Sequence, residues 1–80
     1  MRIPRDVSGA DLARKLKSFG YQITRQTGSH MRLTTQEQGE HHVTVPNHDP
    51  VRLGTLNDIL TEVAAHFQIE RDEVLRRLFE

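Results

Sequence analysis

Two histidines and two arginines carry the groups in this chain that are best suited to phosphate chemistry: His30, Arg32, His48 and Arg52. An imidazole gains and loses protons near neutral pH, and an arginine carries a fixed positive charge. Cleavage of a phosphodiester needs both, a group that moves protons and cations that stabilise charge on the phosphate. The four residues therefore indicate a phosphate-directed site if the fold brings them together.

His30 begins a segment in which polar and apolar residues alternate. Met31 and Leu33 fall on one side of the predicted strand, and His30 and Arg32 fall on the other. We therefore expect the imidazole of His30 to face solvent, where it is not needed for packing. An exposed strand histidine is ordinarily only a polar surface residue, so its neighbours must decide between the two interpretations.

Residues around these four groups add to the candidate site. Gly28 and Ser29 precede His30, and a glycine presents no side chain to an approaching ligand. Gly54 and Thr55 open a predicted helix next to Arg52, and the unpaired N–H groups and dipole of a helix start favour an anion. The residues predicted to bind the substrate are Gly28, Ser29, Arg32, His48, Arg52 and Thr55.

The histidines also offer a competing interpretation as a metal site, because His30, His41, His42 and His48 are four of the five in the chain. Neighbouring residues of a strand point to opposite faces, however, so His41 and His42 do not easily share one ion. The sequence has no cysteine, no HExxH motif and no zinc-finger spacing. We therefore predict no metal and no cofactor, and we assign His66 to the boundary of the core.

Alternating residues predict three antiparallel strands, over residues 21–26, 30–34 and 41–45. The polar stretch before the third strand ends with a glycine and predicts a hairpin turn. Pro46 ends the third strand because proline has no N–H to donate. In the first strand Tyr21, Ile23 and Arg25 alternate with Gln22, Thr24 and Gln26.

Apolar residues three and four positions apart predict helices before and after these strands. The first helix is expected between Ser8, its N-terminal cap, and Gly20, and the second between a cap at Thr55 and Phe67. Residues 69–79 predict a short last helix. The fold class is α+β: a helix, a three-stranded antiparallel sheet, a helix and a short C-terminal helix, with one sheet face open to solvent.

The length of the chain predicts one small domain over residues 1–80. The absence of cysteine fits a reducing compartment, and no apolar run approaches the roughly 20 residues that cross a bilayer, so we expect a cytoplasmic protein without a membrane partner. Residues 1–54 hold eight Lys/Arg against five Asp/Glu, whereas residues 55–80 hold three against six. This split permits a locally basic surface on a neutral protein.

Four stretches, in this order, resemble the HicA toxins, small messenger-RNA interferases of bacterial and archaeal toxin–antitoxin systems. They are SGADLARKLKSFGYQITRQ, TGSHMRL, VTVPNHD and LGTLNDIL, and the resemblance extends from about Ser8 to Phe79. The family fold is similar to a double-stranded RNA-binding domain, which agrees with the element order predicted from periodicity. The chain departs from the family pattern in its neutral charge, in the absence of lysine from PVRLGTL and in Met31 after the histidine.

The resemblance implies that His30 is the catalytic histidine of a metal-independent endoribonuclease that cleaves messenger RNA. It would act in general acid or base catalysis of attack by the ribose 2′-hydroxyl, a mechanism that requires RNA. The resemblance also implies a hetero-oligomer with a HicB-type antitoxin, which covers the active surface. The other signature positions of the family fall on Gly28, Ser29, Pro46, His48, Gly54, Thr55 and Leu56.

Two other classes of function fit the same residues. A noncatalytic RNA-binding module with the same fold agrees with the low net charge. A protein-interaction domain would instead use the acidic C-terminal part, residues 55–80, to contact another protein.

Overall fold

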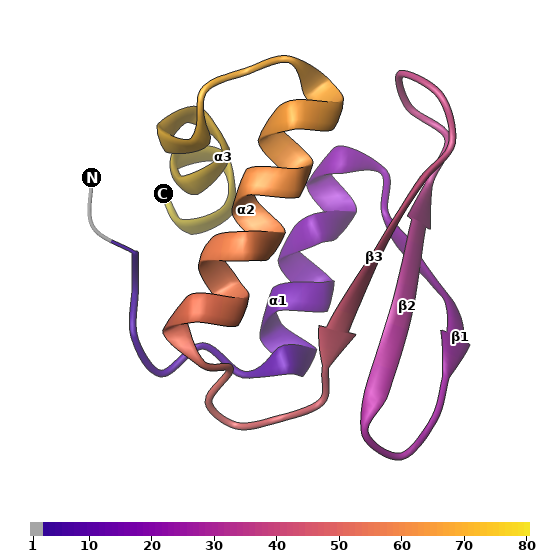
Figure 1. Cartoon of the computed structure of the whole chain (residues 1–80), viewed down its shortest axis with the longest axis vertical. Coiled ribbons are helices and arrows are strands. Elements are labelled where there is room, and N and C mark those ends of the chain that lie inside the picture. Colours follow the sequence, from indigo (N-terminus) through magenta and orange to yellow (C-terminus); the bar gives the residue numbers. More distant parts are fainter. Residues whose placement is uncertain (1–2) are drawn as a thin grey trace.

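Helices α1 and α2 cover one face of an antiparallel sheet, and α3 packs against α2 on the side away from the sheet (Figure 1). This computed structural model describes residues 3–80. The helix, sheet, helix, helix order confirms the predicted α+β class. In chain order the elements are α1 (Gly9–Lys15), the 3-10 helix η1 (Leu16–Phe19), β1 (Gln22–Gln26), β2 (His30–Thr35), β3 (His41–Pro46), α2 (Leu53–Phe67) and α3 (Arg71–Phe79).

The first helical segment begins and ends where its sequence predicts. The Oγ of Ser8 accepts a hydrogen bond from the backbone N–H of Asp11 at 3.0 Å, so Ser8 is the N-terminal cap. Gly20 ends η1 with a φ of 82°, a left-handed conformation that glycine adopts without strain. Gly9 leaves no room for a side chain, because a Cβ there would overlap the carbonyl oxygen of Pro46. The start of α1 therefore lies directly against the end of β3.

The sheet order is β1-β2-β3, and the pairing of β2 with β3 decides which residues share a face. His30 lies opposite Pro46, and Arg32 lies opposite Thr44. Of the outward residues of this pair of strands, His30, Arg32 and Thr44 are exposed, and Thr34, His42 and Pro46 are half-buried. The alternation predicted for both strands is confirmed, since Met31, Leu33, Val43 and Val45 are buried on the inner face.

Strand β1 departs from simple alternation through a β-bulge. Ile23 pairs with Leu33 and Arg25 pairs with Arg32, so Thr24 is an extra residue that has no partner of its own. Strict alternation places Arg25 on the side of Tyr21 and Ile23; the bulge instead brings it opposite Arg32, on the outer face. This shift is not visible in the sequence, because Thr and Arg are common at regular strand positions.

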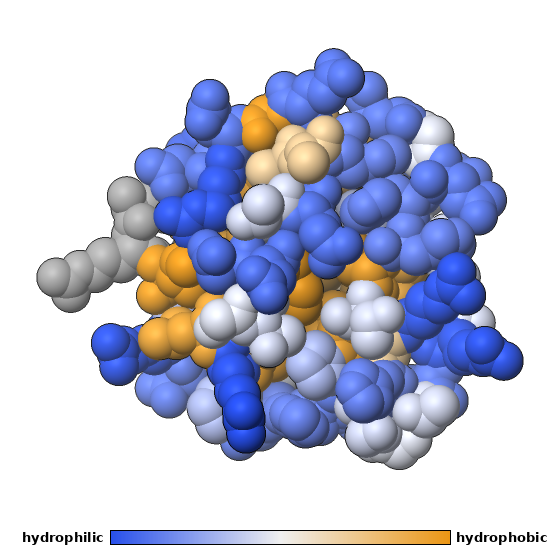
Figure 2. All heavy atoms as spheres, viewed as in Figure 1, coloured by the Kyte–Doolittle hydropathy of each residue, from blue (hydrophilic) through white to orange (hydrophobic). Residues whose placement is uncertain are grey.

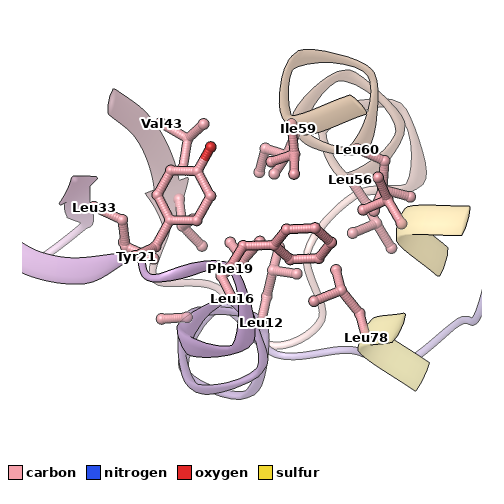
Figure 3. Packing of buried hydrophobic residues seen from close by; sticks show 14 of the residues in the cluster. Leu12, Leu16, Phe19, Tyr21, Leu33, Val43, Leu56, Ile59, Leu60 and Leu78 are labelled. Atoms are coloured by element: carbon pink, nitrogen blue, oxygen red, sulfur yellow. The ribbon is translucent and has the colours of Figure 1, made fainter. Parts of the chain in front are cut away.

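The core fills the space between the inner sheet face and the helices. Tyr21 and Phe19 lie between the sheet residues and the leucines of α1 and α2 (Figure 3). On the face of the molecule seen in Figure 2 hydrophilic residues dominate, and hydrophobic ones are seen mainly in the gaps between them. No helix within residues 3–80 is long and apolar enough to cross a membrane.

Helix α2 begins earlier than its sequence predicts, and the expectation that Thr55 caps it is wrong. The N-terminal cap is Arg52, whose carbonyl accepts from the N–H of Leu56 at 2.9 Å. The residue before this cap, Val51, is buried, and its N–H donates to the carbonyl of Val7 at 2.7 Å. This anchor lets the chain turn into the helix at Arg52, and Thr55 therefore lies inside the first turn.

The C-terminal end of α2 explains why α3 begins two residues later than predicted. Gln68 adopts a left-handed conformation with a φ of 56°, and the N–H of Ile69 donates to the carbonyl of Ala64 at 3.1 Å. Ile69 thus belongs to the end of α2, and α3 begins at Arg71 rather than at residue 69. The apolar residues Val74, Leu75 and Leu78 of α3 are buried.

Candidate functional site

An open groove of about 500 Å³ lies where β2 begins, β3 ends and α2 begins. Four of the residues predicted for the site line it, one from β2, one from the loop after β3 and two from the start of α2. Two further lining residues, on β3, were not predicted. The lining residues are His30, Thr44, Pro46, His48, Arg52 and Thr55.

His30 is exposed and held in place by its neighbours in the turn. Its backbone N–H donates to the Oγ1 of Thr27 at 3.1 Å. The Oγ of Ser29 lies 2.9 Å from its Nδ1, and the N–H of Asn47 donates to the carbonyl of Ser29 at 2.8 Å. Among residues 3–80 the Nε2 of His30 has no partner, so this nitrogen is free to exchange a proton with a ligand.

His48 lies in the loop between β3 and α2, and this loop is tied to α1. Its carbonyl accepts from the N–H of Gly9 at 2.8 Å, while its side chain is exposed. Because Gly9 has no side chain, the two backbones approach closely enough for this bond. The start of α1 therefore fixes the segment that brings His48 to the groove.

Arg52 and Thr55 bring the start of a 15-residue helix to the groove. No side chain caps this helix, and its first N–H groups have no intrahelical partner. Arg52 forms no ion pair within the described residues, and none of the lining residues is acidic. A free guanidinium, two imidazoles and a helix start together favour an anion in the groove.

The structure places the other predicted residues beside the groove and not in its lining. Arg32 lies on the same outer face, opposite the lining residue Thr44. Gly28 is in the turn before β2, and a Cβ there would meet nothing within 4 Å, so its surroundings are open. Ser29 does not line the groove, but its hydroxyl forms a hydrogen bond with the lining residue His30.

Sequence reasoning missed Thr44 and Pro46 as lining residues. Alternation put Thr44 on the wet face, but only the register, with Thr44 opposite Arg32 and Pro46 opposite His30, shows that they share one end of the sheet. Register depends on the hairpin turn, whose length and shape sequence periodicity leaves open.

The remaining histidines lie away from the groove. His41 and His42 are at the other end of the sheet, and His66 on α2 lies against His41. His42 faces outward, with its Nδ1 2.7 Å from the Oγ1 of Thr34 and its Nε2 2.9 Å from Glu40. His41 faces inward, on the face opposite to that of His42, and its ring stacks on that of His66 with centroids 4.4 Å apart. Within residues 3–80 no group of three or more His, Cys, Asp or Glu side chains is arranged to hold a metal ion.

His41 and its surroundings form a half-buried cluster that is separate from the groove. The Nδ1 of His41 lies 2.8 Å from the phenol oxygen of Tyr21, and the Nε2 of His66 lies 2.9 Å from the carbonyl oxygen of Glu37. Burial and the neighbouring His66 lower the pKa of His41, against the attraction of Glu62. Burial, followed by the charge of Glu62, raises the pKa of Tyr21 to about 12. His66 is thus a boundary residue, as expected.

Comparison with known proteins supports the sequence resemblance. The family model described as HicA toxin of bacterial toxin-antitoxin matches residues 9–64, which include every residue of the groove. No curated protein and no solved structure matches the chain.

Proposed function

Because the chain belongs to the HicA family, the toxins of toxin–antitoxin systems, we propose that it is a metal-independent endoribonuclease that cleaves messenger RNA with His30 as its catalytic histidine. The observation that carries this proposal is the groove, in which His30 lies together with His48, Arg52 and the start of α2. His30 lines this anion-favouring groove, and its Nε2 has no partner among residues 3–80. A proton-transferring group and cations thus meet at one place.

His30 acts as the general base in the proposed reaction. Its Nε2 takes the proton of a ribose 2′-hydroxyl, and the 2′-oxygen attacks the adjacent phosphorus. The hydrogen bond between Ser29 and Nδ1 restrains the ring and leaves Nε2 without a protein partner, available to the substrate. As the new bond between oxygen and phosphorus forms, the bond from phosphorus to the 5′-oxygen breaks and a 2′,3′-cyclic phosphate remains.

The leaving 5′-oxygen needs a proton, and His48 is the second imidazole at the groove. Arg52 and the N–H groups at the start of α2 stabilise the negative charge that builds up on the phosphate oxygens. Such fixed donors act at no reorganisation cost during the reaction, because the helix already holds them. The groove therefore supplies a base, an acid and an electrostatic clamp.

The mechanism makes RNA the substrate, since DNA has no 2′-hydroxyl to serve as nucleophile. An oligonucleotide with a single 2′-deoxyribose at the cleaved position should resist the enzyme. The surrounding ribonucleotides remain the same, so the loss reports on chemistry rather than on binding.

Cleavage of RNA by the wild type and by His30→Ala tests the proposal. A positioned histidine contributes about 10²- to 10⁴-fold, so the variant should lose at least about 10²-fold in rate, with the wild type active in the presence of a chelator. His42→Ala is the matched control, because it removes an imidazole from the same sheet face at the far end from the groove. Equal cleavage by His30→Ala contradicts the role of His30, and loss of activity with chelator contradicts metal independence.

A wild-type protein that binds RNA but never shortens it would favour the noncatalytic RNA-binding module instead. The experiment separates the two functions because binding and cleavage are measured on the same oligonucleotide.

The family implies an antitoxin partner, and we propose that this antitoxin is of the HicB type and acts by covering the groove. The groove is open and its histidines are exposed, so a partner can reach them. Co-expression with the antitoxin should restore growth to cells that the toxin arrests. Antitoxin bound to the purified toxin should also block RNA from binding; simultaneous binding of both would contradict coverage of the groove.

A further inference from the structure

Arg25 and Arg32 form a pair of like charges across β1 and β2. They are directly opposite each other in the register, both are exposed, and neither forms an ion pair within residues 3–80. Cross-strand partners lie about 5 Å apart at their Cα atoms. Like charges placed directly opposite destabilise a sheet, so this pair costs stability in the free protein.

The β-bulge creates this pair. Without the bulge, with Thr24 at a regular outward position, alternation would turn Arg25 to the helical side of the sheet. The bulge is itself held by side-chain hydrogen bonds, since the Oγ1 of Thr24 lies 2.8 Å from the Oγ1 of Thr34 and 3.3 Å from the carbonyl oxygen of Arg32. Bulges often re-aim a side chain next to a functional site.

The two arginines lie beside the groove, in one row with its lining residue Thr44 across the open sheet face. Arg25, Arg32 and Thr44 are opposite one another on three successive strands, and Thr44 lines the groove. The row therefore runs from the free edge of β1 to the groove that contains His30. No acidic residue forms an ion pair with either guanidinium within the described part of the chain.

We propose that Arg25 and Arg32 together bind a phosphate group of the RNA next to the one that is cleaved. An anion bound between the two guanidiniums attracts both and offsets their mutual repulsion. Arginine also presents paired N–H donors that match the oxygens of a phosphate. The RNA strand leaves the groove at Thr44 and crosses the sheet along this row. This assignment rests on the proposed action on RNA.

Binding of a fluorescent single-stranded RNA oligonucleotide to the full chain tests the pair. The measurements use the His30→Ala background, so that the RNA stays intact, and compare it with Arg25→Gln, Arg32→Gln and Lys17→Gln added to it. Lys17 is the matched control because it is exposed, forms no ion pair within residues 3–80 and lies on the helical side of the sheet. Kd is measured at several salt concentrations.

Each arginine substitution should raise Kd at least fivefold. It should also make the fall of the log association constant with log salt concentration less steep, by about 0.7 in slope, which corresponds to the loss of one phosphate contact with a single strand. Lys17→Gln should change Kd by less than twofold. An unchanged Kd for Arg25→Gln, or an equal loss for Lys17→Gln, overturns the proposal.

Thermal unfolding gives a second readout that a merely structural role would not produce. Arg25→Gln should raise the unfolding temperature of the RNA-free protein while it weakens RNA binding, because it removes the repulsion between like charges. A lowered unfolding temperature overturns the inferred repulsion.

Cleavage by the otherwise wild-type chain separates this proposal from the proposed function. Active wild type with unaltered binding by Arg25→Gln rejects only the arginine pair. Inactive wild type rejects the nuclease, and the binding comparison still decides the role of the two arginines.

Discussion

The hydroxyl of Ser29 lies 2.9 Å from the Nδ1 of its neighbour His30. This contact joins two adjacent residues whose side chains belong to the turn and to the first position of β2. The hydroxyl engages Nδ1, and Nε2 is the ring nitrogen without a partner among residues 3–80. In the proposed reaction Ser29 is therefore a positioning residue, which acts through the imidazole of His30.

Ser29→Ala should lower kcat for RNA cleavage by about tenfold with little change in KM, since it frees the ring to rotate without removing a phosphate contact. Ser29→Thr keeps the hydroxyl and should retain most of the rate. Steady-state kinetics on one oligonucleotide gives both constants. An equal loss in the two variants would show that the hydroxyl does not orient the ring.

Much of the fold follows from local patterns, and the reasons can be read from individual residues. Ser8 and Gly20 bound the first helical segment because each satisfies a specific backbone requirement, a cap for a free N–H and a left-handed φ. Met31 and Leu33 face inward because one sheet face must be buried. These signals act over a few residues, and they are therefore visible in the sequence.

The features that escaped prediction depend on contacts between distant segments. Helix α2 starts at Arg52 because Val51 is anchored to Val7, far away in the sequence. Arg25 reaches the outer face because β1 bulges against β2. For the candidate site, His30 and Arg52 were identified by residue type, whereas their meeting with Thr44 and Pro46 required the register of β2 with β3.

The stability of the protein should fall as the pH is lowered below about 6.5, because of His41. Its pKa is lowered from the ordinary value of 6.5 in the folded state by burial and by the stacked His66, so the unfolded chain binds a proton more readily. The free energy of unfolding therefore declines as pH falls from about 6.5 through the lowered pKa of the folded state. Urea unfolding at several pH values measures the decline.

His41→Gln should flatten this acid limb. The control is His48→Gln, which removes an exposed imidazole from the loop and should leave the limb unchanged. Identical pH profiles for His41→Gln and the wild type would assign the acid sensitivity to other groups.

Tyr21 should produce a second pH dependence, at the alkaline end. Its pKa is raised from 10.0 to about 12 in the folded state, first by burial and then by Glu62, so the unfolded chain loses the phenol proton at lower pH. The stabilising contribution is complete below pH 10.0 and is lost as pH rises toward about 12. Tyr21→Phe should remove this loss and, at neutral pH, cost about 1 kcal/mol for the hydrogen bond to His41.

A double-mutant cycle of Tyr21→Phe with His41→Gln checks that the two groups interact. The joint effect should be smaller than the sum, because either substitution removes the same hydrogen bond. Strict additivity in urea unfolding would argue against the bond.

Gly9→Ala should destabilise the protein and impair RNA cleavage together. The new Cβ would overlap the carbonyl oxygen of Pro46, and overpacking of this kind costs about 1–3 kcal/mol. To relieve the overlap, α1 must move away from the loop that carries His48, whose carbonyl accepts from the N–H of Gly9. Cleavage should therefore fall even at a temperature where the variant is fully folded.

Gly54→Ala is the matched control, because a Cβ at Gly54 meets nothing within 4 Å and the residue lies in the first turn of α2. Alanine favours helix over glycine by up to about 1 kcal/mol, so this variant should be at least as stable as the wild type. Thermal unfolding of the two variants shows whether a methyl group destabilises the protein only where it overlaps the carbonyl oxygen of Pro46. If Gly9→Ala retained both stability and rate, α1 would not be what holds His48 at the groove.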